Sequence, residues 1–222
     1  MKDETQHLID LALGGYESGM RNALLTNALA AYIAGDATAQ KVLGRPIDLA
    51  RARRDSSGFM TEYRTDLVDR GGSRVSITNE DGSTGMEFKP WLQDATEETR
   101  ARVYDIIKEG IDRGASLGRK ESATGTYPKG SIAADLQGYF SERASHASTV
   151  ARTEAGRIAT EGARRRYVDY GATKGRIVNG AEPCQICQER EGLIVDLTDP
   201  NVVIKPHPNC TCDVVPITEG MG

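Results

Sequence analysis

The segment from Cys184 to Cys212, CQICQEREGLIVDLTDPNVVIKPHPNCTC, contains all four cysteines of this 222-residue chain. Its first two cysteines are separated by two residues, and His207 opens a second group 20 positions after Cys187. A Cys-x-x-Cys turn can point two thiolates at one ion, and a second turn farther along the chain supplies the remaining ligands. The pattern therefore predicts a bound metal ion that gives the C-terminal region its shape.

A tetrahedral metal site has four positions, whereas this segment offers five candidate ligands. The candidates are Cys184, Cys187, His207, Cys210 and Cys212. We expect Cys184, Cys187 and Cys210 to be ligands. The sequence leaves open whether His207 or Cys212 takes the fourth position.

The expected metal is Zn²⁺ in a structural role, because thiolate and imidazole ligands favour zinc. No His-Glu-x-x-His or His-x-Glu motif accompanies the cysteines, as a catalytic zinc would require. Two disulfides would fit the same cysteines in an oxidising compartment, and free buried cysteines would fit an accidental spacing. The N-terminal residues MKDETQH do not resemble an export signal, so a reducing compartment, in which cysteines more often bind metals, is the default expectation.

The composition changes sharply after Gly171, where short β-like segments separated by turn residues begin. These segments are 176–178, 193–195 and 202–204. Runs of valine, isoleucine and leucine between glycine, proline, asparagine and aspartate are typical of short strands. We therefore expect a small β-rich module that brings the two groups of ligands together.

Upstream of Gly171 the sequence predicts mainly helices. Apolar residues at steps of three and four favour a helix from about residue 8 to 34, a second helix from Pro46 towards Asp69, and a third over about 95–117. Ser131 is a natural N-cap for one or two helices that continue to Tyr170, and Gly171 occupies the expected left-handed position after the last turn. Alternating residues around a turn predict a short hairpin or an ordered loop at about 73–90.

The expected fold class is α+β, mainly α, with a long helix in the C-terminal half followed by the small β-rich zinc module. We divide the chain into an N-terminal helical region (1–94), a helical core (95–171) and the metal-binding module (172–222). No apolar stretch is long enough to cross a bilayer, so no membrane association is expected.

A basic strip lies on the long helix of a chain whose formal net charge is -4. Between Arg143 and Arg176 there are eight basic residues against three acids. Contact with nucleic-acid phosphates or with a partner protein is one interpretation, and a solvated helix face tied by salt bridges is the other. The candidate contact residues are Arg152, Arg157, Arg164, Arg165 and Arg166.

Signals of catalysis are weak. The chain has no Gly-x-x-x-x-Gly-Lys phosphate loop and no Gly-x-Gly-x-x-Gly after a strand. His146 lies beside serines on a polar helix, where a solvent-facing residue is the expected interpretation. We expect a protein that is not an enzyme and takes no small-molecule substrate.

Several motifs together resemble the phage head morphogenesis family, the Mu F-like minor head proteins. They are Ala151-Arg152-Thr153-Glu154 on a long helix, the helix end at Tyr167–Gly171, Cys184-x-x-Cys187-x-x-x-x-Gly192, and His207-Pro-Asn-Cys210-Thr-Cys212-x-x-x-Pro216. The resemblance covers roughly 96–216. Thr211 departs from the family, in which arginine is commoner there, and the tryptophan often found before the first cysteine pair is missing.

The resemblance implies a non-enzymatic virion component that joins the phage head during assembly near the portal vertex. Its expected partners are the portal protein and a major capsid or scaffold protein, with contact to phage DNA as a further expectation. Its expected location is the head interior or portal vertex of the virion, and the host cytoplasm during assembly. A protein of another class, a free zinc-containing DNA-binding protein that uses the basic helix 143–176, is the alternative.

Overall fold

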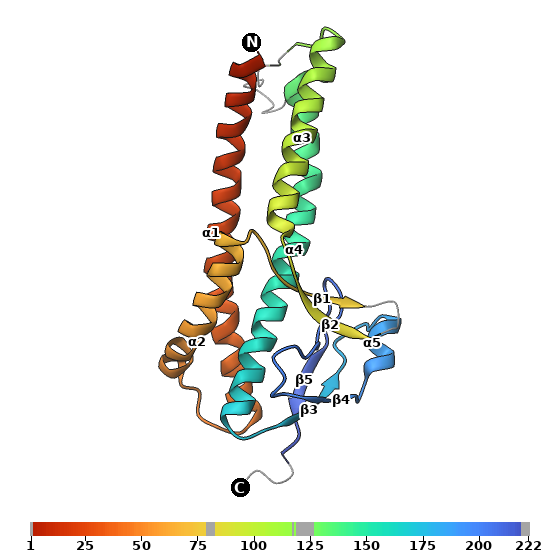
Figure 1. The fold of residues 1–222 in the computed structure, drawn as a ribbon. Helices are drawn as coiled ribbons and strands as arrows, with labels where there is room; N and C mark the ends of the chain where they lie inside the picture. Colours follow the sequence, from red (N-terminus) through yellow and green to blue (C-terminus); the bar gives the residue numbers. More distant parts are fainter. Residues whose placement is uncertain (1, 79–82, 117, 119–126, 219–222) are drawn as a thin grey trace. The chain divides into compact units, whose positions relative to one another are not determined.

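The structure is a computed structural model that describes residues 2–78, 83–116, 118 and 127–218, with side chains from Arg21 onward except those of Thr78, Gln93 and Thr96. The fold is α+β and mainly helical, with long helices and two small sheets (Figure 1). This confirms the expected fold class at that level. Among the described helices, none combines the length and the apolar composition that a membrane span needs.

Five α-helices and a short π-helix are present in the described part of the chain. They are α1 (Lys2–Val42), α2 (Leu49–Arg64), the π-helix η1 (Thr65–Asp69), α3 (Trp91–Asp112), α4 (Ile132–Asp169) and α5 (Gln185–Arg190). Each helix predicted from periodicity is present, and α1 is longer at both ends than the predicted 8–34. The segment from Ser131 to Tyr170 forms one helix rather than two.

The ends of the helices follow the capping signals in the sequence. The Asp48 carboxylate accepts a hydrogen bond from the Arg51 amide at the start of α2, and the Ser131 hydroxyl accepts one from the Ala134 amide at the start of α4. Gly171 has a φ of 90° just after α4, a backbone conformation that glycine adopts without a Cβ penalty. The boundaries of α4 are therefore set by local chemistry at both ends.

The predicted hairpin is also present. Strand β1 (Ser73–Thr78) pairs antiparallel with β2 (Thr84–Lys89), so that Ser73 lies opposite Lys89 and Thr78 opposite Thr84. The predicted turn at 79–82 lies outside the described residues.

A three-stranded antiparallel sheet forms the C-terminal module. Its central strand β3 (Lys174–Val178) lies between β4 (Ile194–Asp196) and β5 (Asp213–Pro216) (Figure 1). The expectation of a strand at 202–204 is wrong. Val203 and Ile204 are buried without pairing in a sheet, and Ile204 belongs to an apolar cluster with Leu197 and Val214, because a short apolar run can be core without being a strand.

The chain divides into two compact units, and each is built from two separate stretches. The first unit comprises Met1–Arg21 and Trp91–Ser148, and the second comprises Asn22–Pro90 and Thr149–Gly222. These units do not follow the three consecutive regions expected from the sequence, because helices α1 and α4 each contribute to both. All five candidate metal ligands and the hairpin belong to the second unit.

Within the second unit, α1 and α4 approach each other at glycines. A Cβ atom added at Gly162 would overlap the backbone carbonyl of Tyr32, and one added at Gly35 would overlap the carbonyl of Ala159. Backbone atoms cannot move away as the end of a flexible side chain can. The separation of the two helices is therefore set by the missing side chains of Gly35 and Gly162.

This contact predicts opposite effects for two glycine-to-alanine changes in helices of the second unit. Gly162→Ala should lower the free energy of unfolding by about 1–3 kcal/mol, because it overpacks a close crossing. Gly58→Ala in α2, where nothing lies within 4 Å of the added Cβ, should raise it by up to about 1 kcal/mol through helix propensity. Urea denaturation measures both, and equal effects of the two changes would contradict the close contact.

Candidate metal centre

The first pair of candidate ligands lies at the start of α5. Cys184 immediately precedes the helix and Cys187 lies in its first turn, where the Gln188 amide donates to the Cys184 carbonyl at 2.9 Å. The Gln188 side chain also donates to the Pro183 carbonyl at 2.9 Å. These bonds fix a single helical turn with both thiols on it.

The second group of ligands lies on a turn from His207 to Cys210. The Cys210 amide donates to the His207 carbonyl, and Asn209 has a φ of 55°. Asparagine is one of the few residues other than glycine that adopt this left-handed conformation readily. The Asn209 amide donates to the Thr153 hydroxyl at 3.0 Å, so the turn is attached directly to α4.

The two turns bring the ligand atoms together. His207 Nε2 lies 3.2 Å from Cys184 Sγ and 3.1 Å from Cys187 Sγ, and Cys187 Sγ lies 3.7 Å from Cys210 Sγ. Thiolates bound tetrahedrally at a Zn–S distance of about 2.3 Å lie about 3.8 Å apart. The five residues thus form a cluster that could hold a metal ion, as the spacing in the sequence predicts.

The cluster consists of two overlapping triads. Ligand atoms of Cys184, Cys187 and His207 lie within 4.8 Å of one another, and so do those of Cys187, Cys210 and Cys212. Cys187 belongs to both triads and is buried. It is therefore the central residue of the cluster.

His207 is oriented by its own backbone neighbourhood. Its Nδ1 lies 2.8 Å from the Pro208 carbonyl oxygen, so the proton of a neutral imidazole is best placed on Nδ1, where it donates to that carbonyl. This leaves the lone pair of Nε2 facing Cys184 and Cys187. A metal-binding histidine usually has such a hydrogen bond on its other nitrogen.

Cys212 has a different environment from the other thiols. Its Sγ lies 3.3 Å from the Asn179 side-chain oxygen, to which the thiol donates, and the residue is 1 % exposed. A thiol that donates a hydrogen bond keeps its proton, whereas a metal ligand has lost it.

Burial shifts the pKa values of two of the candidate thiols upward and leaves them neutral without a cation. Burial and the neighbouring thiols raise the pKa of Cys187, and burial raises the pKa of Cys210. The backbone amide of Cys187 lowers the pKa of the exposed Cys184. A bound cation would supply the charge that the buried thiolates need.

All four cysteines are free thiols. The 3.7 Å between Cys187 Sγ and Cys210 Sγ is much longer than a disulfide bond of about 2.05 Å. Cys187 and Cys210 are therefore not joined by a disulfide bond in this structure.

Three side chains outside the predicted ligand set support the cluster. Lys205 donates to the carbonyl oxygens of Cys210 and Cys212, Thr153 accepts from the second turn, and Asn179 accepts from Cys212. Thr153 is part of the Ala-Arg-Thr-Glu motif on α4, so this motif was a signal that could have identified it. Lys205 and Asn179 lie in segments without a recognisable pattern.

The basic strip on α4 is mostly engaged within the protein. The interpretation of Arg164 and Arg166 as surface contacts is wrong, because their side chains are only 8 % and 0 % exposed. Arg164 bonds to Glu161 and to the Leu197 carbonyl. The other candidates remain at the surface to different degrees: Arg157 pairs with Glu154, Arg165 pairs with Glu161 and Glu62, and Arg152 is exposed.

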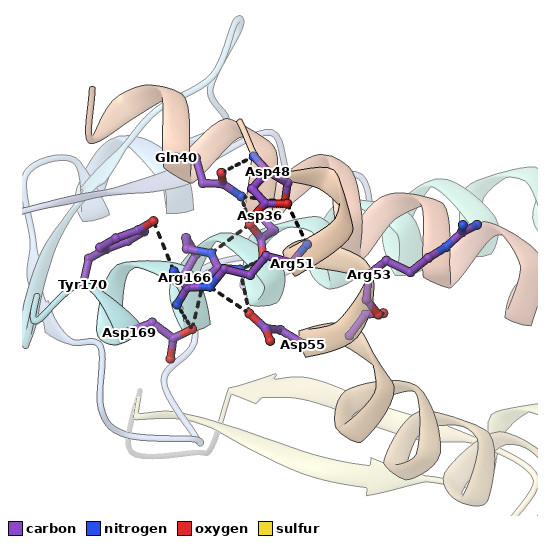
Figure 2. Close-up of polar contacts among 10 residues, drawn as sticks. Asp36, Gln40, Asp48, Arg51, Arg53, Asp55, Arg166, Asp169 and Tyr170 are labelled. Carbon is purple, nitrogen blue, oxygen red and sulfur yellow. Dashed lines mark hydrogen bonds and ion pairs between the residues drawn. The ribbon is translucent and has the colours of Figure 1, made fainter. Parts of the chain in front are cut away.

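Arg166 is a buried cation in the middle of an ionic cluster. Figure 2 shows its guanidinium pointing between Asp36 of α1, Asp55 of α2 and Asp169 of its own helix, with N–O distances of 2.6, 2.9 and 3.3 Å. Burial opposes its charge, but the hydrogen bonds with Asp36 and Asp55 outweigh burial and raise its pKa. The residue joins three helices of the second unit.

Gln40 and Arg51 extend this cluster around its edge. Gln40 donates to Asp36 at 2.6 Å and accepts from the Asp48 amide at 2.6 Å, while Arg51 bonds to Asp55 and to Tyr170 (Figure 2). The buried polar atoms of Asp36 are thereby satisfied, as burial requires.

Substitution of Arg166 tests this interpretation of the basic strip. Arg166→Met should lower the free energy of unfolding by about 3–5 kcal/mol, because Asp36 is then buried without its cation. Arg152→Met, which removes the same charge at an exposed position, should change it by less than about 0.5 kcal/mol. Urea denaturation provides the measurement, and similar values for the two variants would show that Arg166 is not a structural cation.

No family model matches the chain, and no curated protein or solved structure matches it either.

Proposed function

We propose that the cysteine and histidine cluster binds one structural Zn²⁺ ion and that the chain is a non-enzymatic minor head protein of a phage. The single observation that supports the zinc is that His207 Nε2 lies 3.1–3.2 Å from the Cys184 and Cys187 thiols, while the Cys187 thiol lies 3.7 Å from that of Cys210. These four residues come from two turns of the second unit, so an ion held by them would cross-link the module.

The ligand set that fits best is Cys184, Cys187, His207 and Cys210. The orientation of His207 leaves Nε2 available, and the thiol of Cys212 donates to Asn179 instead. In this set Cys212 lies beside the ion without binding it. A zinc ion in such a closed set of four ligands has no open position for a substrate, which is typical of a structural site.

The need for a cross-link follows from the size of the module. Its sheet has strands of five, three and four residues, and the buried residues of the apolar cluster around Ile177 are otherwise three cysteines, with Val195 packed against them. Structural zinc contributes about 10–16 kcal/mol of apparent folding free energy in small zinc modules. The ion would therefore stabilise what the small core alone does not.

The head-protein assignment is supported by the motif resemblance over 96–216 and by the environment of its residues. Thr153 of the Ala-Arg-Thr-Glu motif bonds to the His-Pro-Asn-Cys turn, and Glu154 is buried beside Tyr63. Motifs far apart in the sequence thus belong to one structural arrangement. The proposed partners are the portal protein and a major capsid or scaffold protein, and the proposed location is the virion.

Two cysteine variants test the metal site. Purified wild-type protein should contain one zinc per chain, and Cys187→Ser should lose it together with much of the cooperative thermal transition of the module. Cys212→Ser should retain the full zinc content and a tetrahedral Co²⁺ absorption spectrum, because that thiol is outside the proposed ligand set. Mass spectrometry measures the metal content of each variant, and absorption spectroscopy of the Co²⁺-loaded protein reports the coordination geometry.

A metal-free native protein would refute the zinc site. If Cys212→Ser loses the metal while His207→Ala keeps it, Cys212 and not His207 is the fourth ligand.

Co-expression with a portal and a major capsid protein tests the head assignment. The chain should sediment with procapsids, and Cys187→Ser should be depleted from them because its C-terminal module is not held in place. Arg152→Met serves as the control, since it leaves the metal centre unchanged. Gradient sedimentation followed by immunoblotting of the fractions measures incorporation.

The alternative, a free DNA-binding protein, predicts a different result. The protein would then be missing from every particle fraction and would shift DNA in a gel with an affinity that falls steeply with salt. The engagement of Arg164 and Arg166 inside the protein leaves few cations on the helix for this purpose. We therefore favour the head assignment.

A further inference from the structure

A cavity of about 320 Å³ lies in the second unit, outside the metal centre. It is bordered by α2, the β1–β2 hairpin, α4 and the segment 200–205. All of its lining residues belong to that unit. Its volume is in the lower part of the range of ligand-binding pockets.

The wall formed by α4 contains carboxylates that are already paired. Glu154 accepts hydrogen bonds from Arg157 at 2.8 Å and from the Tyr63 hydroxyl at 3.3 Å. Glu161 accepts from Arg164 and Arg165. Burial tends to raise the pKa of Glu161, but the two arginines outweigh it and lower that pKa, so the carboxylate is charged and neutralised at neutral pH.

The rim carries positive charge whose contacts among the described residues are with neutral oxygens. Arg74 is exposed and bonds to the side-chain oxygen of Asn201, and Lys205 bonds to the carbonyls of Cys210 and Cys212. The lining includes five cations, Arg74, Arg157, Arg164, Arg165 and Lys205, and four carboxylates, Glu62, Asp66, Glu154 and Glu161. Asp66 is paired with Arg70, which lies outside the lining, so the cavity favours an anionic ligand.

Apolar side chains line the remainder of the cavity. Phe59 of α2, Met86 of the hairpin and Ile204 of the segment 200–205 come from three different elements. Phe59 stacks on Tyr63 with ring centroids 5.8 Å apart and is covered by the Arg165 guanidinium at 5.3 Å. A ligand that fills the cavity therefore needs an apolar group next to its anionic group.

The four carboxylates of the lining discriminate between kinds of anion. A free phosphate or phosphate monoester carries about two negative charges at neutral pH, more than the small excess of cations over carboxylates in the lining can balance. A side-chain carboxylate carries one charge, and the amides next to it in a peptide can bond to both acidic and basic groups. The acidic and basic groups of the wall thus suit a peptide, whose backbone offers both N–H donors and carbonyl acceptors, better than a nucleic-acid backbone, whose phosphate oxygens only accept.

We propose that this cavity binds a short acidic peptide segment of a partner protein, with a carboxylate at the cationic rim and a neighbouring aliphatic side chain against Phe59 and Met86. This inference goes beyond the proposed head function and does not require it. The partner is defined here by chemistry, as a chain with an exposed segment of alternating acidic and aliphatic residues.

The cavity is also linked to the metal centre. The segment 200–205 lies between the ligands Cys187 and His207 in the sequence, and Lys205 at its end bonds to the carbonyls of two candidate ligand residues. Val202 and Ile204 line the cavity. Removal of the metal should therefore weaken peptide binding by loosening one wall of the cavity.

The test uses the acetylated and amidated peptide Leu-Glu-Ile-Asp, its uncharged counterpart Leu-Gln-Ile-Asn, inorganic phosphate and a single-stranded oligonucleotide as probes. Each is titrated into the full-length, ¹⁵N-labelled protein while amide resonances are monitored by NMR. The acidic peptide should shift resonances of β1, β2 and 200–205, and its uncharged counterpart should bind at least about tenfold more weakly, since the rim attracts the carboxylates.

Two arginine variants provide the matched comparison. Arg74→Glu reverses a rim charge and should weaken binding of the acidic peptide by at least about tenfold. Arg54→Glu makes the same change at an exposed position of α2 outside the lining and should leave the affinity within about twofold. Both variants should keep the zinc content of the wild type. A loss of peptide binding can therefore be distinguished from a loss of the proposed metal site.

The proposal is overturned if none of the probes shifts the cavity resonances, or if both peptides bind equally well. It is also overturned if phosphate or the oligonucleotide binds at these resonances more tightly than the acidic peptide. Equal effects of Arg74→Glu and Arg54→Glu would assign the binding to general charge rather than to the cavity.

Discussion

The buried charge of Arg166 is the constraint around which the second unit is organised. A guanidinium with no exposed surface must find its hydrogen-bond acceptors inside the protein. Asp36 and Asp55 supply them from α1 and α2, so these helices can pack on α4 only where both carboxylates reach the same cation. The backbone contact at Gly35 and Gly162 allows α1 to come close enough for this.

Helix α4 is also the element to which the C-terminal module is attached. Thr153 bonds to the amide of Asn209, Thr160 to the carboxylate of Asp213, and Arg164 to the carbonyl of Leu197. These contacts lie along three turns of one helix and reach three different parts of the module. The orientation of the sheet is thus determined by α4, whereas the proposed ion would determine the local shape of the two ligand turns.

The sequence was informative where local chemistry determines the structure. Ser131, Gly171 and the spacing of the cysteines each act through residues close in the chain or through a fixed ligand geometry, and the structure has the predicted caps and the predicted cluster. The sequence was misleading where the environment of a residue depends on partners far away in the chain. Arg166 seemed to belong to an exposed helix face because Asp36 lies 130 positions away, and no helical periodicity contains that information.

The segment 202–204 shows the same limit for apolar residues. Val202, Val203 and Ile204 have the composition of a strand, yet the third strand of the sheet is β5, because Val214 and Val215 are the residues opposite Ile177 and Arg176. A run of three apolar residues does not indicate whether its backbone will pair in a sheet or only its side chains will pack in the core. In this protein the side chains of Val203 and Ile204 are buried.

The presence of Cys212 beside a set of four other donors has a kinetic consequence. Ligand substitution at a thiophilic ion commonly proceeds by an associative path, in which an incoming donor attacks before the departing one leaves. Cys212 is already within 4.8 Å of Cys187 and Cys210, so the entropy of bringing in a further donor has largely been lost on folding. If the cluster holds an ion as proposed, this nearby donor would speed the exchange of the ion, and its lability would depend on a residue outside the coordination sphere.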